Sequence, residues 1–238
     1  MTKTPTLMEM LKAGVHFGHK KSKRYPKMEP YIYTTRAGIN VIDLNKTLEK
    51  LEETLKAVKK LSSEGKVLLF VGTKKQAQKI IKKYALECGM PYVINRWVGG
   101  AFTNFSVFRK NIKKYLDLQD KMNKGDLDKY TKKERIGFKR EIERLESIVG
   151  GLSMMDKLPD AIFVVDTKKD KIAIKEANRL KIPVISICDT NSNPVDIKWV
   201  IPANDDAVKS IELITGLIAE AVKEGREEKG NNNPAVSK

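Results

Sequence analysis

Cysteine, histidine and long apolar runs are all scarce in this sequence of 238 residues. The two cysteines, Cys88 and Cys188, lie in or beside apolar stretches, so we expect reduced core thiols of the kind found in cytosolic proteins. No apolar run approaches the ~20 residues that a membrane-spanning helix needs. Residues 1–14 also lack the apolar segment and cleavage site of a signal peptide. These absences favour a cytoplasmic location.

Signatures of catalysis are equally scarce. The segment VGTKK (71–75) lacks the glycine patterns of dinucleotide-binding and P-loop proteins, although Lys74 and Lys75 could contact a phosphate. That phosphate could belong to a small metabolite or to RNA, and RNA is favoured. Asp166 and Asp189 end two predicted strands and could bind magnesium or do acid–base chemistry, but capping a turn or helix is the simpler interpretation. We predict no enzyme and no cofactor.

The only two histidines, His16 and His19, stand together in HFGH. Their spacing could place both on one metal ion, but structural zinc needs four ligands and no other Cys or His is near. Packing and RNA contact are the alternatives, and we predict no metal site. Because both histidines lie in a segment without other catalytic features, a His-based hydrolase triad would lack its base.

Positive charge is the strongest feature that is present. Lysine and arginine outnumber aspartate and glutamate by 46 to 30, a formal net charge of +16. Such an excess usually serves a polyanion, with nucleic acid the first candidate and an anionic membrane surface the second. Between His19 and Arg36 a single acid, Glu29, accompanies a cluster of basic residues and tyrosines: Lys20, Lys21, Lys23, Arg24, Lys27 and Arg36, with Tyr25, Tyr31 and Tyr33. Lysine and arginine can neutralise phosphates, and tyrosine rings can stack on unpaired bases, so this cluster predicts an RNA contact. The alternative is a solvated loop whose tyrosines pack on the sheet domain.

A second candidate RNA contact lies at residues 95–110, where Gly99 and Gly100 permit close approach of another backbone. Its polar and aromatic candidates are Arg96, Trp97, Thr103, Asn104, Arg109 and Lys110. Trp97 suits a packed anchor better than a stacking platform. No known RNA-reading module is present, so composition alone predicts contact by shape and phosphates.

Apolar runs that alternate with helical periodicity predict an α/β fold with a mostly parallel sheet covered on both sides. Asp43 and Gly65 bound a predicted helix of period 3.6, and Thr73 is the predicted cap of the next helix. Further helices are predicted at about 170–180 and from residues 204–207 onward. The predicted strands are 67–72, 92–94, 161–165, 184–188 and 199–201.

Two stripes of apolar residues at alternating three- and four-residue spacing predict an inserted antiparallel helical hairpin, a coiled coil, at residues 105–152. The first stripe runs from Phe105 through Gln119 to Met122, and a capping box at Thr131 and Glu134 starts the second helix. The predicted organisation is a basic N-terminal segment (1–40), an α/β domain (41–104 and 153–224), this hairpin, and a disordered tail (225–238).

Eight motifs in order resemble the bacterial small-subunit ribosomal protein S2 family across roughly residues 7–224. They include LKAGVHFGH (11–19), FVGTKKQAQ (70–78), RWVGGAFTNF (96–105) and IPVISICDTN (182–191). The resemblance implies a flavodoxin-like (Rossmann-like) parallel sheet flanked by helices, with the inserted hairpin. It also implies a structural constituent of the small ribosomal subunit that binds ribosomal RNA and neighbouring ribosomal proteins and supports translation and assembly. In many bacteria such proteins help hold the large messenger-binding ribosomal protein.

Carried over by matching positions, the resemblance implies an RNA-facing set of basic residues with less certain neighbours at Trp97, Thr103 and Asn104. The set is His16, His19, Lys20, Arg24, Lys27, Arg36, Lys74, Lys75, Arg96 and Arg109. Two rival functions stay open: an enzyme for a phosphorylated metabolite at the VGTKK and DTN loops, and a free protein that binds RNA or a membrane surface. Neither a membrane nor a small-molecule substrate is the expected partner.

Overall fold

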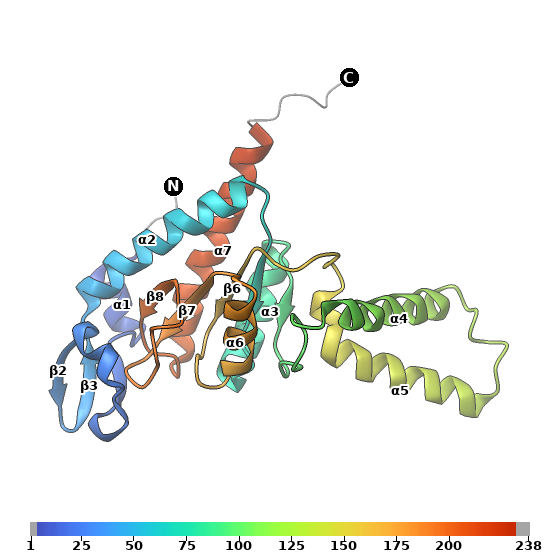
Figure 1. Cartoon of the computed structure of the whole chain (residues 1–238), viewed down its shortest axis with the longest axis horizontal. Helices are drawn as coiled ribbons and strands as arrows, with labels where there is room; N and C mark the ends of the chain where they lie inside the picture. Colours follow the sequence, from blue (N-terminus) through green and yellow to red (C-terminus); the bar gives the residue numbers. More distant parts are fainter. Residues whose placement is uncertain (1–3, 232–238) are drawn as a thin grey trace.

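A five-stranded parallel sheet is the centre of the fold in the computed structural model, which describes residues 4–231 (Figure 1). Its strands pair in the order β5-β4-β6-β7-β8, and every pair is parallel. They are β4 (Leu68–Val71), β5 (Tyr92–Val93), β6 (Ala161–Val164), β7 (Val184–Cys188) and β8 (Trp199–Pro202). Counted along the chain, this order is 2-1-3-4-5, as in flavodoxin-like doubly wound sheets. The predicted α/β, Rossmann-like fold is confirmed.

Helices cover both faces of the sheet because the strand residues alternate between two apolar cores. Leu68 and Phe70 enter one core, together with α2 (Leu44–Ser63), α3 (Lys75–Glu87) and α7 (Val208–Asn231). Leu69 and Val71 enter the other core, against α6 (Lys171–Arg179). Strands buried on both faces explain why these segments read as continuous apolar runs in the sequence.

A small antiparallel sheet, which the sequence did not predict, forms within residues 1–40 and extends just past them. Its order is β1-β3-β2, with β1 (Phe17–Lys20), β2 (Ile32–Arg36) and β3 (Ile39–Ile42). Helix α1 (Leu7–Lys12) precedes it, and two 3₁₀ helices, η1 (Lys21–Lys23) and η2 (Pro26–Tyr31), join β1 to β2. The predicted boundary at residue 40 cuts through β3. Most side chains of β1 and β2 are exposed or half-buried, so they lack the apolar alternation that reveals a strand.

Two helices, α4 (Phe105–Asn123) and α5 (Lys132–Val149), follow β5 and extend side by side away from the sheet (Figure 1, green and yellow). The predicted capping box at Thr131 starts α5. A short 3₁₀ helix, η3 (Gly150–Leu152), leads back to the sheet. The predicted stripe on α4 is wrong at its far end, where Leu118 is buried while Gln119 and Met122 are exposed. A coiled coil in the strict sense stays a prediction.

The C-terminal helix is longer than the sequence suggested. Helix α7 continues to Asn231, so residues 225–231 are not a disordered tail; residues 232–238 of that prediction lie outside the described residues. The extension packs against the rest of the fold. Lys59 of α2 pairs with Glu224 and Glu228 at 3.2 and 2.7 Å, and the Arg226 guanidinium donates to the Cys88 carbonyl at 2.7 Å. Tertiary contacts therefore hold a segment that is polar by composition.

Two predicted helix starts are displaced for a common reason: residues expected at those starts make other contacts. Thr73 does not cap α3; its hydroxyl donates to Asp170 at 2.8 Å. Helix α7 begins at Val208, after the predicted acidic start, because Asn204 caps the preceding turn and Asp205 pairs with Lys74.

Two further expectations concern the cysteines and the membrane. Cys88 and Cys188 are both buried and free, and burial raises the pKa of the Cys88 thiol to about 11. Within residues 4–231, none of the helices combines the length and the apolar character that crossing a membrane requires.

Candidate nucleic-acid interface

The predicted RNA-binding residues fall into three groups by exposure. Trp97 is buried, and His16, His19, Arg24 and Lys74 are half-buried. The remaining candidates are exposed: Lys20, Lys21, Lys23, Lys27, Arg36, Lys75, Arg96, Thr103, Asn104, Arg109 and Lys110. Most of the predicted interface is thus open to a partner, and the exceptions have specific structural causes.

The N-terminal basic surface consists of Lys20, Lys21, Lys23, Lys27 and Arg36, on and between the strands of the small sheet. Among the described residues, no carboxylate lies within ion-pair distance of any of the five. Arg24 differs, since its guanidinium lies 3.3 Å from Glu29. Of the neighbouring tyrosines, only Tyr33 is freely exposed, at 75%, while Tyr25 and Tyr31 pack against the core. Five unpaired cations beside an open ring suit phosphates and an unpaired base.

The second candidate contact lies elsewhere on the molecule. Residues 95–104 lead into α4, which includes Arg109 and Lys110 and which Figure 1 shows at the opposite end of the body from β2 and β3. Its exposed residues form what we call the loop surface: Arg96, Thr103, Asn104, Arg109 and Lys110. Arg109 has a partner, Asp156, at 3.4 Å. The two candidate contacts predicted from the sequence therefore lie on two separate surfaces, and Lys75, at the start of α3, belongs to neither.

Trp97 is a packed anchor and is not available for stacking on a base. It is only 6% exposed, its ring meets Phe102 edge to face, and its indole N–H donates to Glu176 at 3.3 Å. The same Glu176 carboxylate accepts backbone N–H groups from Gly100 and Phe102 at 2.7 and 2.9 Å. Burial opposes the charged form of Glu176, but these backbone hydrogen bonds outweigh it and lower its pKa. Glu176, on α6, thus holds the loop that presents the loop surface, a role that the sequence did not predict.

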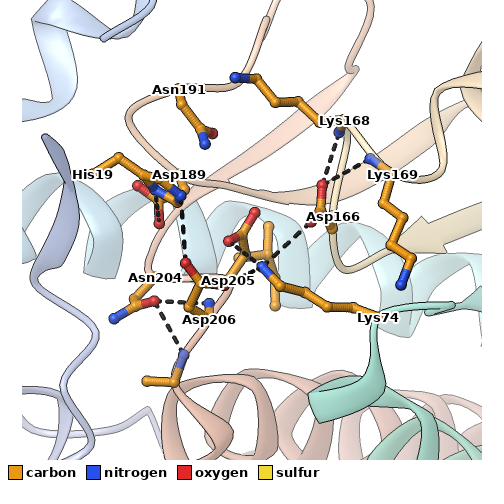
Figure 2. Close-up of polar contacts among 12 residues, drawn as sticks. His19, Lys74, Asp166, Lys168, Lys169, Asp189, Asn191, Asn204, Asp205 and Asp206 are labelled. Atoms are coloured by element: carbon orange, nitrogen blue, oxygen red, sulfur yellow. Dashed lines mark hydrogen bonds and ion pairs between the residues drawn. The ribbon is translucent and has the colours of Figure 1, made fainter. Parts of the chain in front are cut away.

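Lys74 lies inside a charged cluster at the carboxyl ends of the central strands (Figure 2). Its ammonium nitrogen lies 3.3, 2.8 and 2.6 Å from carboxylate oxygens of Asp166, Asp205 and Asp206. Burial opposes the charged form of Lys74, but hydrogen bonds to Asp205 and Asp206 outweigh it and raise the pKa. The Lys74 ammonium group is therefore engaged by aspartates of the protein itself and is not free to bind a phosphate. Its neighbour Lys75 is exposed to solvent.

His19 joins the same cluster from β1. Its Nδ1 lies 3.1 Å from Asp189 and its Nε2 lies 3.4 Å from Asp206, as Figure 2 shows. The hydrogen bond to Asp189 raises the pKa of His19. Burial, reinforced by the charges of Asp166 and Asp189, raises the pKa of Asp205 to about 7. The cluster therefore carries more carboxylates than its two basic groups can neutralise at neutral pH.

Four members of this cluster could hold a cation. Ligand atoms of His19, Asp189, Asp205 and Asp206 all lie within 4.8 Å of one another, and imidazole and carboxylate are both good donors to divalent metals. These four residues are too far apart along the chain for the sequence to suggest that they form one site. His16 does not belong to this group. His16 packs on Phe17, with ring centroids 4.0 Å apart.

The simpler interpretation, capping of a turn, holds for Asp166. Asp166 accepts the backbone N–H groups of Lys168 and Lys169 at 2.9 and 3.0 Å, which caps the turn after β6. Asp189 accepts hydrogen bonds from Thr190 in the turn after β7. Both residues also belong to the charged cluster, which ties the ends of the central strands to the N-terminal sheet.

Fold and surface together define a class: a Rossmann-like α/β protein with an appended sheet whose basic side chains are free to meet a polyanion. The comparison with known families is more specific. Residues 10–225 match the sequence model of the family described as Ribosomal protein S2. The match covers most of the chain, so the protein belongs to this family of small-subunit ribosomal proteins, which are structural parts of the ribonucleoprotein that carries out translation. The resemblance identified from the eight motifs is confirmed.

Proposed function

We propose that this protein is a structural constituent of the small ribosomal subunit and binds its ribosomal RNA mainly through the N-terminal basic surface. One observation carries the proposal: five exposed cations of this surface have no carboxylate partner among the described residues. Unpaired cations release counterions from RNA without first breaking an ion pair of their own. The loop surface is the second proposed RNA contact.

Helices α4 and α5 differ from the N-terminal basic surface because many of their charges are paired internally. Lys114 and Arg144 both pair with Glu141, at 2.6 and 2.8 Å, and Lys121 pairs with Asp117 at 2.8 Å. Apolar side chains of α4 and α5, including Val107, Leu116 and Ile136, are exposed beside these pairs. This mixture suits a protein partner better than RNA, so we propose that the hairpin contacts neighbouring ribosomal proteins.

The remaining parts of the proposal follow the family. The protein supports subunit assembly and translation in the cytoplasm, and contributes to holding the large messenger-binding ribosomal protein. It has no catalytic activity. Residues 105–152 form an inserted hairpin unit, and residues 41–104 and 153–224 form the α/β domain to which the N-terminal sheet is attached.

Replacing Lys20, Lys21, Lys23 and Lys27 by alanine tests the proposal. We expect weaker binding to small-subunit RNA, poorer incorporation into subunits, and an unchanged thermal melt. The wild-type affinity should fall with salt at a logarithmic slope of about −0.7 to −0.9 per phosphate contact, and the variant's slope should be flatter.

The matched control replaces four exposed lysines of α2 and α3: Lys56, Lys60, Lys79 and Lys82. Equal losses in the two variants would attribute binding to net charge alone and contradict the proposed surface. Finding the wild-type protein mainly away from small subunits in sedimented cell extract would contradict the function itself.

A further inference from the structure

The small N-terminal sheet has one face that packs on the body and one that is open. On the central strand, β3, Asn40 and Ile42 are buried. The alternate residues of β3 differ, since Ile39 is 40% exposed and Val41 is half-buried. Residues opposite one another on antiparallel strands share a face of the sheet. The strand pairing therefore defines what we call the outer face: Phe17 and Lys20 of β1, Thr34 and Arg36 of β2, and Ile39 and Val41 of β3.

The inner face is held against the loop after β7. A Cβ on Gly18 would lie only 2.5 Å from the Thr190 side chain, so the two backbones approach closely here. The backbone N–H of His19 donates to the Thr190 hydroxyl at 2.9 Å, and the Asn40 amide donates to the His19 carbonyl at 3.0 Å. These contacts fix the sheet on the body and leave the outer face to solvent.

The outer face exposes a contiguous apolar patch. Phe17 lies opposite Val41, and Ile39 is two residues from Val41 on the same face. Phe17 is 53% exposed, although one side of its ring packs on His16 with the ring centroids 4.0 Å apart. Exposed apolar patches with a polar rim mark the interaction sites of soluble proteins. The outer face is therefore a surface that a partner would cover.

Tyr33 adds a second aromatic ring beside this patch. Ile32 lies opposite Ile42 and Thr34 opposite Val41, so Tyr33 is an extra residue that β3 does not match. A β-bulge of this kind redirects a side chain, and the Tyr33 side chain is 75% exposed. Phe17 and Tyr33 belong to the two outer strands, which lie about 10 Å apart because β3 separates them. The two rings can therefore hold two different bases.

The charge of the outer face indicates the class of partner. Lys20 and Arg36 both lie opposite Ile39, one on each side of it, and neither has a carboxylate within ion-pair distance among the described residues. None of the six residues of the outer face is acidic. An apolar patch with a purely cationic rim suits RNA, which presents flat bases and phosphates together. A duplex keeps its bases stacked inside, so only unpaired nucleotides can use the rings.

We propose that the outer face binds unpaired nucleotides of ribosomal RNA, with bases on Phe17 and Tyr33 and phosphates against Lys20 and Arg36. This inference rests on the proposed function and deepens it, because it gives the N-terminal sheet a preference for single-stranded RNA over duplex. Phe17 was not a candidate from the sequence, since an exposed apolar residue cannot be told from a core residue before the fold is known.

The test uses the full-length chain and two fluorescent probes, a short oligouridylate that stays unpaired and an RNA duplex of the same length. Phe17→Leu with Tyr33→Leu keeps apolar bulk and net charge but removes both flat rings. We expect affinity for the oligouridylate to fall roughly tenfold or more and affinity for the duplex to stay unchanged. Phe17→Tyr with Tyr33→Phe keeps both rings and should bind like wild type. Unchanged oligouridylate binding by the leucine variant, or equal losses for both probes, would overturn the proposal.

Salt dependence separates stacking from charge. The leucine variant keeps every cation, so its logarithmic slope of affinity against salt should equal that of wild type. Lys20→Ala with Arg36→Ala should instead flatten the slope, by about 0.7 to 0.9 for each lost phosphate contact, and weaken both probes. A flattened slope in the leucine variant would show that the rings only hold the cations in place, and would contradict stacking.

Tyr130→Leu is the matched control, because it removes an exposed ring between α4 and α5, far from the N-terminal sheet. It should bind the oligouridylate like wild type, and an equal loss there would overturn the site. Thermal melts check folding; if Phe17→Leu proves unstable, Tyr33→Leu alone carries the test, since its side chain is the more exposed of the two.

Two results would reassign the outer face. If the leucine variant binds both probes like wild type but is lost from small subunits, the face docks a ribosomal protein and the RNA proposal is overturned. If it binds and assembles like wild type while the N-terminal lysine variant still loses subunit RNA, this inference fails and the proposed function stands.

Discussion

The ammonium nitrogen of Lys74 lies 2.8 Å from a carboxylate oxygen of the buried Asp205, although the two residues are 131 positions apart in the chain. The contact joins the loop after β4 to the loop after β8, at opposite sides of β6 and β7. A lysine that the sequence suggests as a phosphate contact therefore serves the fold.

Lys74→Met should lower the free energy of unfolding by about 3 kcal/mol, because it leaves Asp205 and its acidic neighbours without their cation. Urea unfolding of the two proteins measures the difference. Lys75→Met is the matched control; it removes the same charge from the exposed neighbouring residue and should change stability by less than about 0.5 kcal/mol. Similar losses in both variants would show that the ion pairs of Lys74 contribute little.

Stability should fall with rising pH through the neutral range because of Asp205. Its pKa is about 7 in the folded protein and 3.8 ordinarily, so between these values the folded state binds a proton that the unfolded state has released. The stability that this proton contributes is present below pH 3.8 and is lost as the pH rises through 7. The slope can reach about 1.4 kcal/mol per pH unit.

His19 acts in the same direction, since its folded pKa is raised above 6.5: its contribution is present below pH 6.5 and is lost as the pH rises through the folded value. Unfolding measured from pH 5 to 8, with a chelator to keep cations off the cluster, should show this decline in the wild type. Asp205→Asn and His19→Gln should each flatten the curve. A wild-type curve parallel to that of both variants would contradict these assignments.

Glu176→Gln should loosen the loop at residues 95–104. The neutral amide accepts hydrogen bonds less strongly than the carboxylate, and its NH₂ group would face the N–H donors of Gly100, Phe102 and Trp97. We expect a loss of about 2–3 kcal/mol in unfolding free energy and a red shift of tryptophan emission as Trp97 becomes wetter. The exposed Glu220→Gln, on α7, should change neither quantity.

Gly225→Ala should destabilise the protein, even though alanine favours a helix by roughly 1 kcal/mol over glycine. A Cβ at this position would meet the Lys59 carbonyl oxygen and lie 2.7 Å from the Ser62 Cβ, so α2 and α7 would have to separate. Overpacking of this kind costs about 1–3 kcal/mol. Gly230→Ala, in the same helix with open space around it, should be neutral or stabilising. Thermal melts of both variants measure the contrast.

The sequence predicted those elements in which buried and exposed residues follow a regular pattern within the element itself. The five strands of the central sheet are continuous apolar runs, and Asp43 caps α2 as expected. The N-terminal sheet was missed because its strands are largely exposed and therefore carry no periodic signal. The extension of α7 was missed because its polar residues are held by partners such as Lys59, far away in the sequence.

The sequence by itself determined that the chain is a basic α/β protein of a ribosomal family. Net charge, apolar runs and motifs depend only on which residues are present and on their order along the chain. Only the tertiary structure decided which basic residues are free. Lys20 and Lys27 are exposed and have no ion-pair partner within residues 4–231, whereas Lys74 pairs with three aspartates. Trp97, the aromatic candidate, is buried and donates its indole N–H to Glu176. A side chain's availability depends on the partners that folding brings within a few ångströms, and those partners lie up to 131 residues away along the chain.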